Sequence, residues 1–280
     1  MSELYGRVVE VLVGPKGGTG KLITDLRIQF KVEKTLDPQP NQAQIQITNL
    51  SDATRALCET EGAFIVLRAG YTGAVKTLYQ GDIARVDTRI QGPDIVTSIE
   101  AGDGEQEYRN AKADVSFGPG AKFTQVFGAL SDRLGLAKGS VKIPNPGDQF
   151  LQGYTGAGTV REQLDYLAEK QGLEWSIQDG QLQMLAPEAS TDEDVVVLSA
   201  ATGLVGSPFK TKVTRPDLAR KGKGKDESGI QAIALLNAEL RPGRRIQVES
   251  RLVNGIYKIQ KVSHSGDTHG NSFYSELEAR

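Results

Sequence analysis

The 280-residue sequence has few of the residues that build metal, redox and membrane sites. It contains one cysteine, Cys58, two histidines and a formal net charge of −2. A single thiol can form neither an intrachain disulfide nor a cysteine-based metal cage, and it fits assembly in a reducing compartment. The near-neutral charge gives no global field that would favour nucleic acid or an anionic membrane as a partner.

Long apolar runs are also missing. No stretch of about 18 apolar residues is present, and the N-terminus MSELYGRVVE lacks the basic and apolar regions of a signal peptide. We therefore expect a soluble chain with no membrane anchor and no standard export leader. Glycine, in contrast, is abundant at 32 residues, and the apolar fraction is a modest 38%. This composition favours short strands joined by many turns over a helical bundle.

The glycine-rich stretch VLVGPKGGTGKLITDL, residues 11–26, has ingredients of a phosphate-binding loop. It follows an apolar run and contains the pair Gly20-Lys21. Relative to that pair, Pro15 stands where a small residue is needed, and Leu22 stands where a hydroxyl would hold magnesium. Proline also removes a backbone N–H from a loop that would bind phosphate through N–H groups. The spacing therefore argues against a nucleotide site.

The segment after the glycines supports the same conclusion. Residues 25–35, DLRIQFKVEKT, alternate apolar and polar side chains and so predict a strand. A P-loop would instead open a helix, whose N-terminus faces the phosphates. We interpret residues 14–21 as the tip of a long hairpin, with 25–35 as its return strand.

Strand patterns fill most of the first hundred residues. A short helix after Ser51, which can act as its N-cap, interrupts them. The further period-two runs are residues 41–49, 63–71, 77–90 and 94–102. Hydrophobic runs separated by glycine-containing turns are typical of a small barrel or sandwich.

The last ninety residues again alternate apolar and polar side chains with a period of two. RRIQVESRLV places Ile246, Val248 and Leu252 on one face, and Asn254-Gly255 is a strong turn signal before IYKIQKVSH. The closing SFYSELEA repeats the alternation.

Between the two strand-rich regions the period becomes helical. KFTQVFGALSDRLGL predicts a helix that stops at Gly135. Thr159 begins a capping box for a second helix, which stops at Gly172. Asp179-Gly180 then predicts a hairpin turn.

The chain is thus expected to be mainly β, and α+β overall. Two barrel-like β domains, residues 1–103 and 189–280, would flank a small α+β insert of residues 104–188, which contains two helices and a hairpin.

The two histidines, His264 and His269, lie five residues apart with Asp267 between them. That arrangement suggests a metal site, but a third ligand is not indicated by the sequence. A polar hairpin tip between two strands explains both histidines with fewer assumptions. We expect neither a metal nor another cofactor.

A cluster of carboxylates in EAGDGEQEYRN, namely Glu100, Asp103, Glu105 and Glu107, raises the possibility of a glycosidase pair. Sequence cannot set the separation of two carboxylates in a loop, and a solvated domain boundary is the simpler interpretation. A serine nucleophile elbow is also absent, because Tyr274 stands where the last glycine of that motif belongs.

Residues 210–225, KTKVTRPDLARKGKGK, form the most charged segment. They include Arg220, Lys221, Lys223 and Lys225 and could contact phosphates nonspecifically. The segment has no aromatic residue on which a base could stack, so a loop is the simpler interpretation.

Several segments in order resemble one family. They are FKVEKTLDPQPNQAQIQITNLSDATR, ATGLVGSPFKTK, ALLNAELRPGRRIQVES and NGIYKIQKVSHSGDTHGNSFYSELEA, with VREQLDYLAEKQGLEWSIQDGQLQ in the insert. Together they resemble the baseplate hub proteins of contractile-tailed bacteriophages. The similarity covers most of the chain and lies in the order of the segments, since none is a catalytic signature.

The resemblance implies a non-enzymatic virion protein, assembled in the host bacterial cytoplasm. Three chains would form a homotrimeric ring that joins the sixfold tail tube, or a tube-initiator protein, to the threefold central spike. Surrounding baseplate proteins would be further partners, and DNA would pass through the channel without sequence-specific binding. Strand edges completed by neighbouring subunits would hold such a ring together.

The two glycine-rich or basic tips are natural docking elements for these partners. The candidate docking residues are Pro15, Lys16, Lys21, Arg220, Lys221, Lys223 and Lys225. Two other classes of function stay open from the residues alone: a tail-associated protein that binds or degrades the cell wall, and a nucleic-acid-binding module that uses the basic segment.

Overall fold

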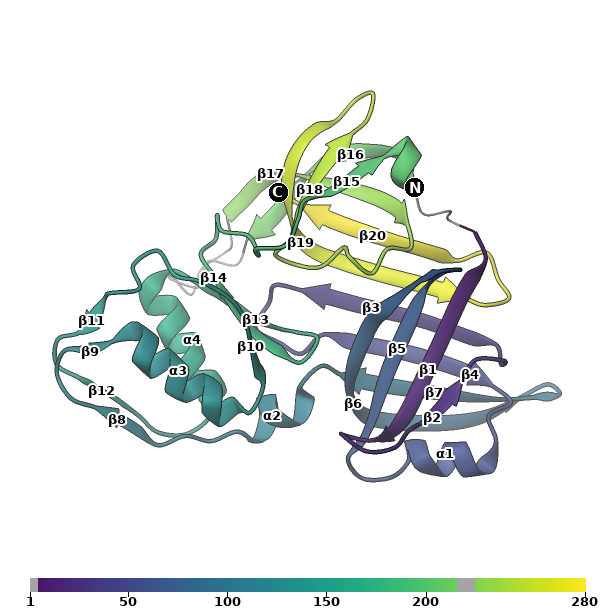
Figure 1. The fold of residues 1–280 in the computed structure, drawn as a ribbon, viewed down its shortest axis with the longest axis horizontal. Coiled ribbons are helices and arrows are strands. Elements are labelled where there is room, and N and C mark those ends of the chain that lie inside the picture. Colours follow the sequence, from purple (N-terminus) through teal and green to yellow (C-terminus); the bar gives the residue numbers. More distant parts are fainter. Residues whose placement is uncertain (1–4, 216–224) are drawn as a thin grey trace.

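A computed structural model describes residues 5–215 and 225–280 of the chain (Figure 1). A 13-stranded sheet dominates it, with the path β16-β17-β20-β19-β3-β4-β7-β6-β5-β1-β2 and with β18 and β15 attached beside β19. The mainly β class expected from the sequence is confirmed. None of the described helices is long and apolar enough to cross a membrane.

The N-terminal part of the sheet forms what we call the first unit. Its strands show the burial alternation expected from period-two sequence, for example along β4. The elements are β1 (Arg7–Pro15), β2 (Lys21–Ile23), β3 (Ile28–Thr35), β4 (Gln42–Thr48), α1 (Asp52–Cys58), β5 (Ala63–Tyr71), β6 (Ala74–Gln91) and β7 (Asp94–Gly102). The Ser51 side chain caps α1 by accepting a hydrogen bond from the Thr54 N–H, as the sequence predicts.

The C-terminal part forms the second unit, drawn in green and yellow in Figure 1. Its elements are β15 (Val196–Ser199), the 3-10 helix η1 (Ala200–Thr202), β16 (Leu204–Arg215), β17 (Lys225–Leu235), β18 (Arg245–Glu249), β19 (Asn254–Asp267) and β20 (Phe273–Ala279).

The insert between the units has a hydrophobic core of its own, centred on Phe127, Leu164 and Trp175. Gly135 and Gly172 end its two long helices in the left-handed conformation, and Asp179-Gly180 forms the hairpin turn with positive φ at both residues. The sequence predicts all three features. The elements are α2 (Glu105–Asn110), β8 (Val115–Phe117), β9 (Ala121–Lys122), α3 (Phe123–Leu134), β10 (Ala137–Lys142), β11 (Gln149–Phe150), β12 (Tyr154–Gly156), α4 (Val160–Gln171), β13 (Glu174–Gln178) and β14 (Gln181–Leu185).

The two units have the same strand order. The path β3-β4-β7-β6-β5-β1 of the first corresponds, strand for strand in chain order, to β16-β17-β20-β19-β18-β15 of the second. The units differ at the end of this path, because β1 runs antiparallel to β5 whereas β15 runs parallel to β18. The fold is therefore built from a repeated unit that the insert interrupts.

The repeat extends to individual irregularities. In the first unit a β-bulge interrupts the pairing of β6 with β7 just after Ile83. In the second unit a bulge interrupts β19 and β20 just after Ile259. Short matching sequences surround these bulges, Ile-Ala-Arg-Val against Ile-Gln-Lys-Val on one strand and Ile-Glu-Ala against Leu-Glu-Ala on its neighbour. Equivalent positions in the two units can therefore be assigned from the pairing register.

The expected closure into two barrels is not found. In each unit the outer strands, β5 with β1 and β18 with β15, pack over the buried face of the other four and form one core with them. No strand pairing among the described residues closes either unit. Instead, β19 pairs with β3, and this pairing joins both units in one open sheet.

Two expected turns also differ from the structure. The return strand of the N-terminal hairpin is the short β2, and β3 pairs with β4 and β19 because the chain turns again after Ile23. Asn254 and Gly255 belong to β19 and pair with β18. Ser250 makes the preceding turn through hydrogen bonds with Val253, and this turn leaves Leu252 exposed instead of placing it on the strand face.

Candidate functional site: open sheet edges and a buried junction

One face of the long sheet is polar in both units. On it, Glu100 of β7 stands opposite Gln44 of β4. At the equivalent place in the second unit, Glu278 of β20 stands opposite Gln231 of β17 and accepts a 3.0 Å hydrogen bond from its side-chain amide. The opposite face carries the cores, so the polar face is the one available to solvent or a passing macromolecule.

Two long strand edges of the sheet are open among the described residues, besides those of the short strands β2 and β15. Strand β16 pairs only with β17, and β6 beyond Asp82 pairs only with β7, because β5 ends there. Unpaired edges present rows of N–H and C=O groups that can pair with another chain. Large apolar side chains lie exposed at both edges: Phe209 on β16 is 56% exposed and Ile90 on β6 is 82% exposed.

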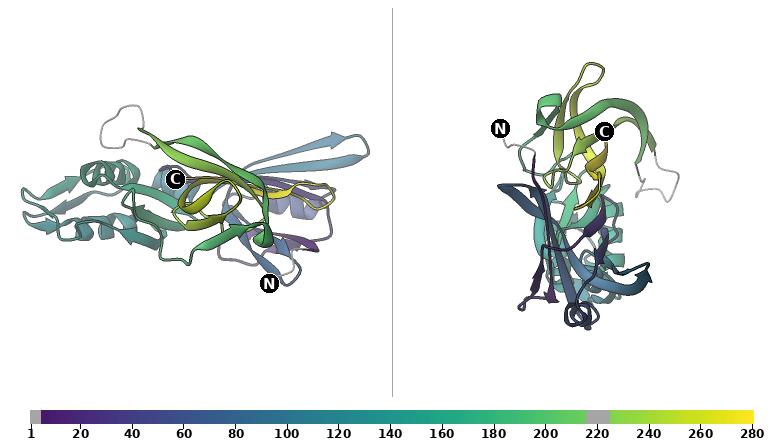
Figure 2. Two further views of the ribbon diagram at one scale, coloured as in Figure 1. Left: turned by 90° about the horizontal axis from the view of Figure 1, so that it is seen from above. Right: turned by 90° about the vertical axis from the view of Figure 1, so that its right-hand side faces the viewer.

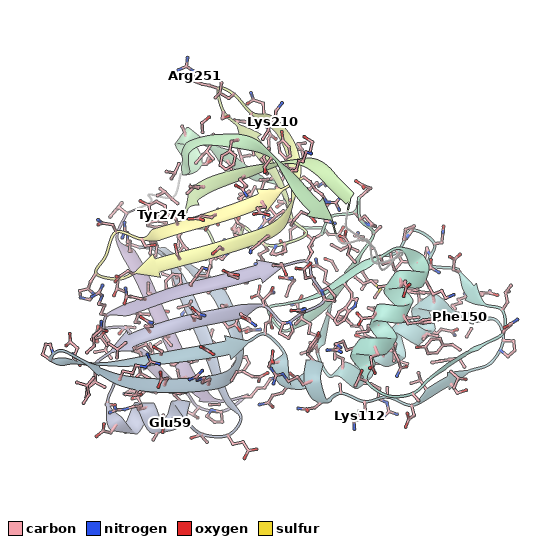
Figure 3. All side chains as sticks on the ribbon, turned by 180° about the vertical axis from the view of Figure 1, so that it is seen from behind. Glu59, Lys112, Phe150, Lys210, Arg251 and Tyr274 are labelled. Atoms are coloured by element: carbon pink, nitrogen blue, oxygen red, sulfur yellow. The ribbon has the colours of Figure 1, made fainter. Side chains whose placement is uncertain are left out.

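The β6 edge belongs to an arm. The hairpin formed by the ends of β6 and β7 extends beyond the rest of the molecule in the left view of Figure 2. Figure 3 shows Lys210 on the other edge strand and Tyr274 on β20 in the second unit, far from Phe150 in the insert. Strand β16 is the first strand of the sheet path, whereas β6 lies within it between β7 and β5, and its open edge begins where β5 ends.

The N-terminal tip places three candidate docking residues. Pro15 ends β1 and Lys21 begins β2, opposite Val13. Lys16 lies against its own chain, with Nζ 2.5 Å from Glu107 of the insert and 3.4 Å from Asp82. Partial burial acts to lower the pKa of Lys16. The hydrogen bond to Glu107 and the charge of Asp82 outweigh this effect, so the pKa of Lys16 is raised. The tip is therefore tied to the start of the insert.

The basic tip is placed only in part. Arg220, Lys221 and Lys223 lie outside the described residues, and Lys225 is described only as the first residue of β17, paired with Arg215.

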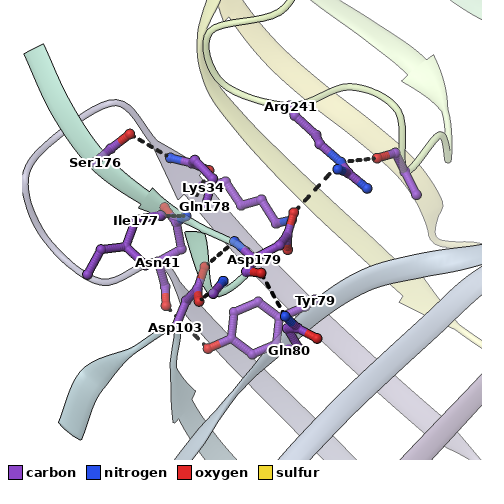
Figure 4. A network of polar contacts seen from close by, with 12 residues as sticks. Lys34, Asn41, Tyr79, Gln80, Asp103, Ser176, Ile177, Gln178, Asp179 and Arg241 are labelled. Atoms are coloured by element: carbon purple, nitrogen blue, oxygen red, sulfur yellow. Dashed lines mark hydrogen bonds and ion pairs between the residues drawn. The ribbon is translucent and has the colours of Figure 1, made fainter. Parts of the chain in front are cut away.

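A buried polar junction holds the insert against the first unit (Figure 4). Asp103 is 1% exposed, and its carboxylate accepts hydrogen bonds of 2.5 and 2.7 Å from the backbone N–H groups of Asp179 and Gly180. Lys34 of β3 is equally buried and forms a 2.6 Å ion pair with the Asp179 side chain. The insert's hairpin turn is thus bound by Lys34 of β3 and by Asp103, the residue that follows β7.

Further hydrogen bonds surround that turn. The Asn41 amide donates to the Ile177 carbonyl at 2.8 Å, and the Gln178 amide donates to the Thr35 carbonyl at 2.6 Å. From the second unit, Arg241 approaches Asp179 at 3.7 Å. All three parts of the chain meet at this one turn.

The environment of Asp103 corrects the expectation of a solvated acidic boundary. Desolvation, together with the nearby charge of Asp179, raises the pKa of Asp103 to about 7, against the opposing effect of Lys34. Such a pKa suits proton transfer, but both carboxylate oxygens are already occupied by backbone N–H groups. The group is therefore arranged to hold the turn and not to meet a substrate.

A second ionic contact joins the insert to the second unit. Glu174 of β13 lies 3.3 Å from Lys258 and 3.4 Å from Arg280, and all three side chains are buried. Burial lowers the pKa of Lys258, although the charge of Glu174 opposes that change.

The histidines are not a pair at a hairpin tip, contrary to expectation. His264 lies fully buried in β19 with Nδ1 2.8 Å from the Ser275 hydroxyl, and burial lowers its pKa to about 3. His269 lies in the turn after β19. Asp267 binds Arg27 at 2.7 Å, and the hydrogen bond from Arg27 lowers the pKa of Asp267 to about 2. The described residues contain no group of three or more potential metal ligands.

The sequence did carry a signal for part of the junction. Lys34 follows Ile28, Phe30 and Val32 on the same side of one alternating strand, so a lysine there must be buried with a partner. Nothing local identifies Asp179 as that partner, since it is 145 residues away.

Comparison with known proteins agrees with this architecture. The family model described as baseplate hub gp41 matches residues 8–279. No match was found among curated protein sequences.

Solved structures show a similar fold at low sequence identity. The 43 kDa tail protein of prophage MuSo2 from Shewanella oneidensis has a TM-score of 0.67 and 12% identity, covering 97% of this chain and 96% of that one. The tail protein from Neisseria meningitidis MC58 has a TM-score of 0.65 and 13% identity, covering 98% and 96%. The E. coli c3393 protein, a component of the type VI secretion system, has a TM-score of 0.60 and 11% identity, covering 91% and 73%.

Proposed function

The chain belongs to the baseplate hub gp41 family, and from that premise we propose that it forms the central ring of a contractile phage tail. It is a structural protein of the phage baseplate. In our proposal, three copies make a ring that joins the sixfold tail tube, or its initiator protein, to the threefold central spike. The ring leaves a channel through which the genome passes.

The repeated unit is the observation that carries this proposal. Each chain holds two units of the same strand order side by side in one sheet. Three chains therefore supply 3 × 2 = 6 similar units, which suits a sixfold partner on one side, while the three inserts keep a threefold arrangement for the other. One protein can then contact a sixfold partner on one side and a threefold partner on the other.

The polar face of the sheet suits the wall of a channel. It carries amide side chains such as Gln44 and Gln46 and charges of both signs, such as Lys31 and Glu33. This mixture offers neither the aromatic platforms nor the basic stripe with which proteins retain nucleic acid. DNA would pass along it without sequence-specific binding.

In the same proposal, residues 1–103 and 189–280 form the ring and residues 104–188 project toward the spike or surrounding baseplate proteins. The tips that include Pro15, Lys16 and Lys21, and Arg220, Lys221, Lys223 and Lys225, are the proposed docking elements. Assembly would take place in the host cytoplasm, and the finished protein would reside in the virion.

The test is the native mass of the purified chain by light scattering across concentration, alone and with the candidate spike. One chain has a mass of 30.2 kDa, so a trimer has 3 × 30.2 = 90.6 kDa. A trimer under either condition is the expected result. A mass that stays at 30.2 kDa under both conditions contradicts the ring.

A further inference from the structure

The contact between the two units inside one chain shows how two units join. Strand β19 runs antiparallel to β3 over seven residue pairs, from Lys261 with Thr35 to Asp267 with Gln29. Within this contact, Ser263 stands opposite Glu33, and Lys261 reaches Glu33 at 3.8 Å on the polar face.

Strand β6 is the counterpart of β19 in the first unit. After the shared bulge, Arg85 pairs with Glu100 as Lys261 pairs with Glu278. Two residues further on, Asp87 therefore occupies the place of Ser263. In β19 this stretch is covered by β3, whereas in β6 the same side has no partner strand among the described residues.

Strand β16 is the counterpart of β3 in the second unit. Lys31 of β3 stands opposite Gln44, and Phe209 of β16 stands opposite Gln231, the glutamine at the equivalent position. Counting two residues along both strands, Thr211 takes the place of Glu33. The edge that β3 offers to β19 is the edge that β16 leaves open.

We propose that the open edge of β6 in one copy pairs antiparallel with β16 of the next copy, repeating the contact that β19 and β3 make within the chain. This inference rests on the proposed ring and names its subunit contact. The register follows from the equivalences: Asp87 stands opposite Thr211, and Arg89 stands opposite Phe209.

The side chains at the two edges fit this pairing. Lys210 and Lys212 of the next copy would stand opposite the uncharged Thr88 and Val86 on the other face of the sheet, whereas two copies of β16 placed together would bring these lysines near one another. Arg89 would lie over Phe209, an arrangement that favours cation–π contact and covers an aromatic ring now 56% exposed.

The two edges are different surfaces, so the contact is head to tail. Contacts of this kind close into rings when the rotation between neighbours permits. Both of these edges would then be paired, which removes the aggregation hazard that they pose in the isolated chain.

The test is cross-linking by cysteines placed across the contact. Directly opposite residues of antiparallel strands have Cα atoms about 4.5–5.5 Å apart, within the range of a disulfide. The variant Asp87→Cys with Thr211→Cys, in a Cys58→Ala background, is oxidised and separated under denaturing conditions. We expect a ladder that ends at the trimer, 3 × 30.2 = 90.6 kDa.

Matched controls define the register and polarity. Asp87→Cys with Phe209→Cys offsets the pair by two residues, to about 7–8 Å, and should cross-link several-fold less. Either single variant alone should give no ladder, and an equal mixture of the two should stop at dimers. Thermal melting of each variant verifies that it is folded.

The outcomes separate this inference from the proposed ring. A 90.6 kDa native trimer that forms no disulfide between positions 87 and 211 overturns the edge pairing and leaves the ring intact. Efficient dimers from Asp87→Cys alone would show a twofold contact and also overturn it. A chain that is monomeric at every concentration and with spike contradicts both proposals.

Discussion

Glu100 and Glu278, far apart in the sequence, occupy the same position in two successive units of one sheet. Each follows a large aliphatic residue and precedes an alanine, and each stands opposite a glutamine, Gln44 or Gln231, on the neighbouring strand. Equivalent residues of a repeated unit are expected to make equivalent contacts. The structure of one chain therefore contains a template for the contact between chains.

The buried ion pair at the junction should be a large contributor to stability. Replacing Lys34 with Met removes the cation nearest to Asp179 and leaves that carboxylate only the more distant Arg241; breaking a buried pair in this way typically costs about 3–5 kcal/mol. The matched control is Lys31→Met on the exposed face of the same strand, with an expected change within about 0.5 kcal/mol. Urea unfolding of the three proteins measures both, and equal losses would contradict the assignment.

The Asp103 carboxyl should make folding stability depend on pH. Its pKa is about 7 in the folded chain, above the ordinary value of 3.8. Between these values the folded state binds the extra proton, so the contribution favours folding near pH 4 and is lost as pH rises to 7. We expect the wild-type advantage over Asp103→Asn in unfolding free energy to fall by roughly 2–4 kcal/mol across this range.

The comparison with Asp103→Asn is necessary because His264 acts in the opposite direction. Its pKa is lowered to about 3, so its contribution is present above pH 6.5 and is lost as pH falls. The difference between wild type and variant cancels this second effect. An advantage that does not change with pH would show that Asp103 is not protonated in the folded junction.

The N-terminal tip should matter for assembly more than for folding. Replacing residues 14–20 with Asn-Gly keeps the Val13–Lys21 pair and closes the hairpin with a favourable two-residue turn. The replacement also removes Lys16 and its contact with Glu107, a partly exposed pair worth about 1 kcal/mol or less. We expect near-native melting and weaker incorporation into baseplates. The variant Lys16→Ala removes the ion pair but keeps the loop, so it shows how much of any effect comes from the ion pair alone. Unfolding of the unassembled variant would contradict the docking role.

The single thiol should be silent in the native protein. Cys58 is 1% exposed, and burial raises the pKa of its thiol to about 11. Little thiolate is then present at about pH 8, and access is blocked. A thiol reagent should label Cys58 stoichiometrically in denaturant and negligibly without it. Rapid native labelling would mean that α1 opens readily.

Local features of the fold could be predicted from the sequence because local chemistry determines them. The stops at Gly135 and Gly172 and the turn at Asp179-Gly180 need left-handed backbone that glycine, and less often Asp or Asn, accepts. Alternation identified most strands, and it also placed His264 in phase with the buried Val262. The hairpin-tip interpretation is therefore wrong for His264, which is buried on the same side of β19 as Val262.

The pairing between distant strands could not be predicted in the same way. An alternating strand such as β3 satisfies its burial pattern beside any partner, so its pattern does not select β19 over β1. The duplicated unit was hidden for a related reason, since only short matches around Ile83 and Ile259 survive. The Lys34–Asp179 pair depends on the same long-range arrangement.

The most direct test of the ring is end-on electron microscopy of the purified oligomer or isolated baseplate hub. We expect a central channel whose inner wall shows six similar lobes, from two units in each of three chains, with three inserts outside it. A closed disc without a channel, or an inner wall with three lobes only, would contradict it.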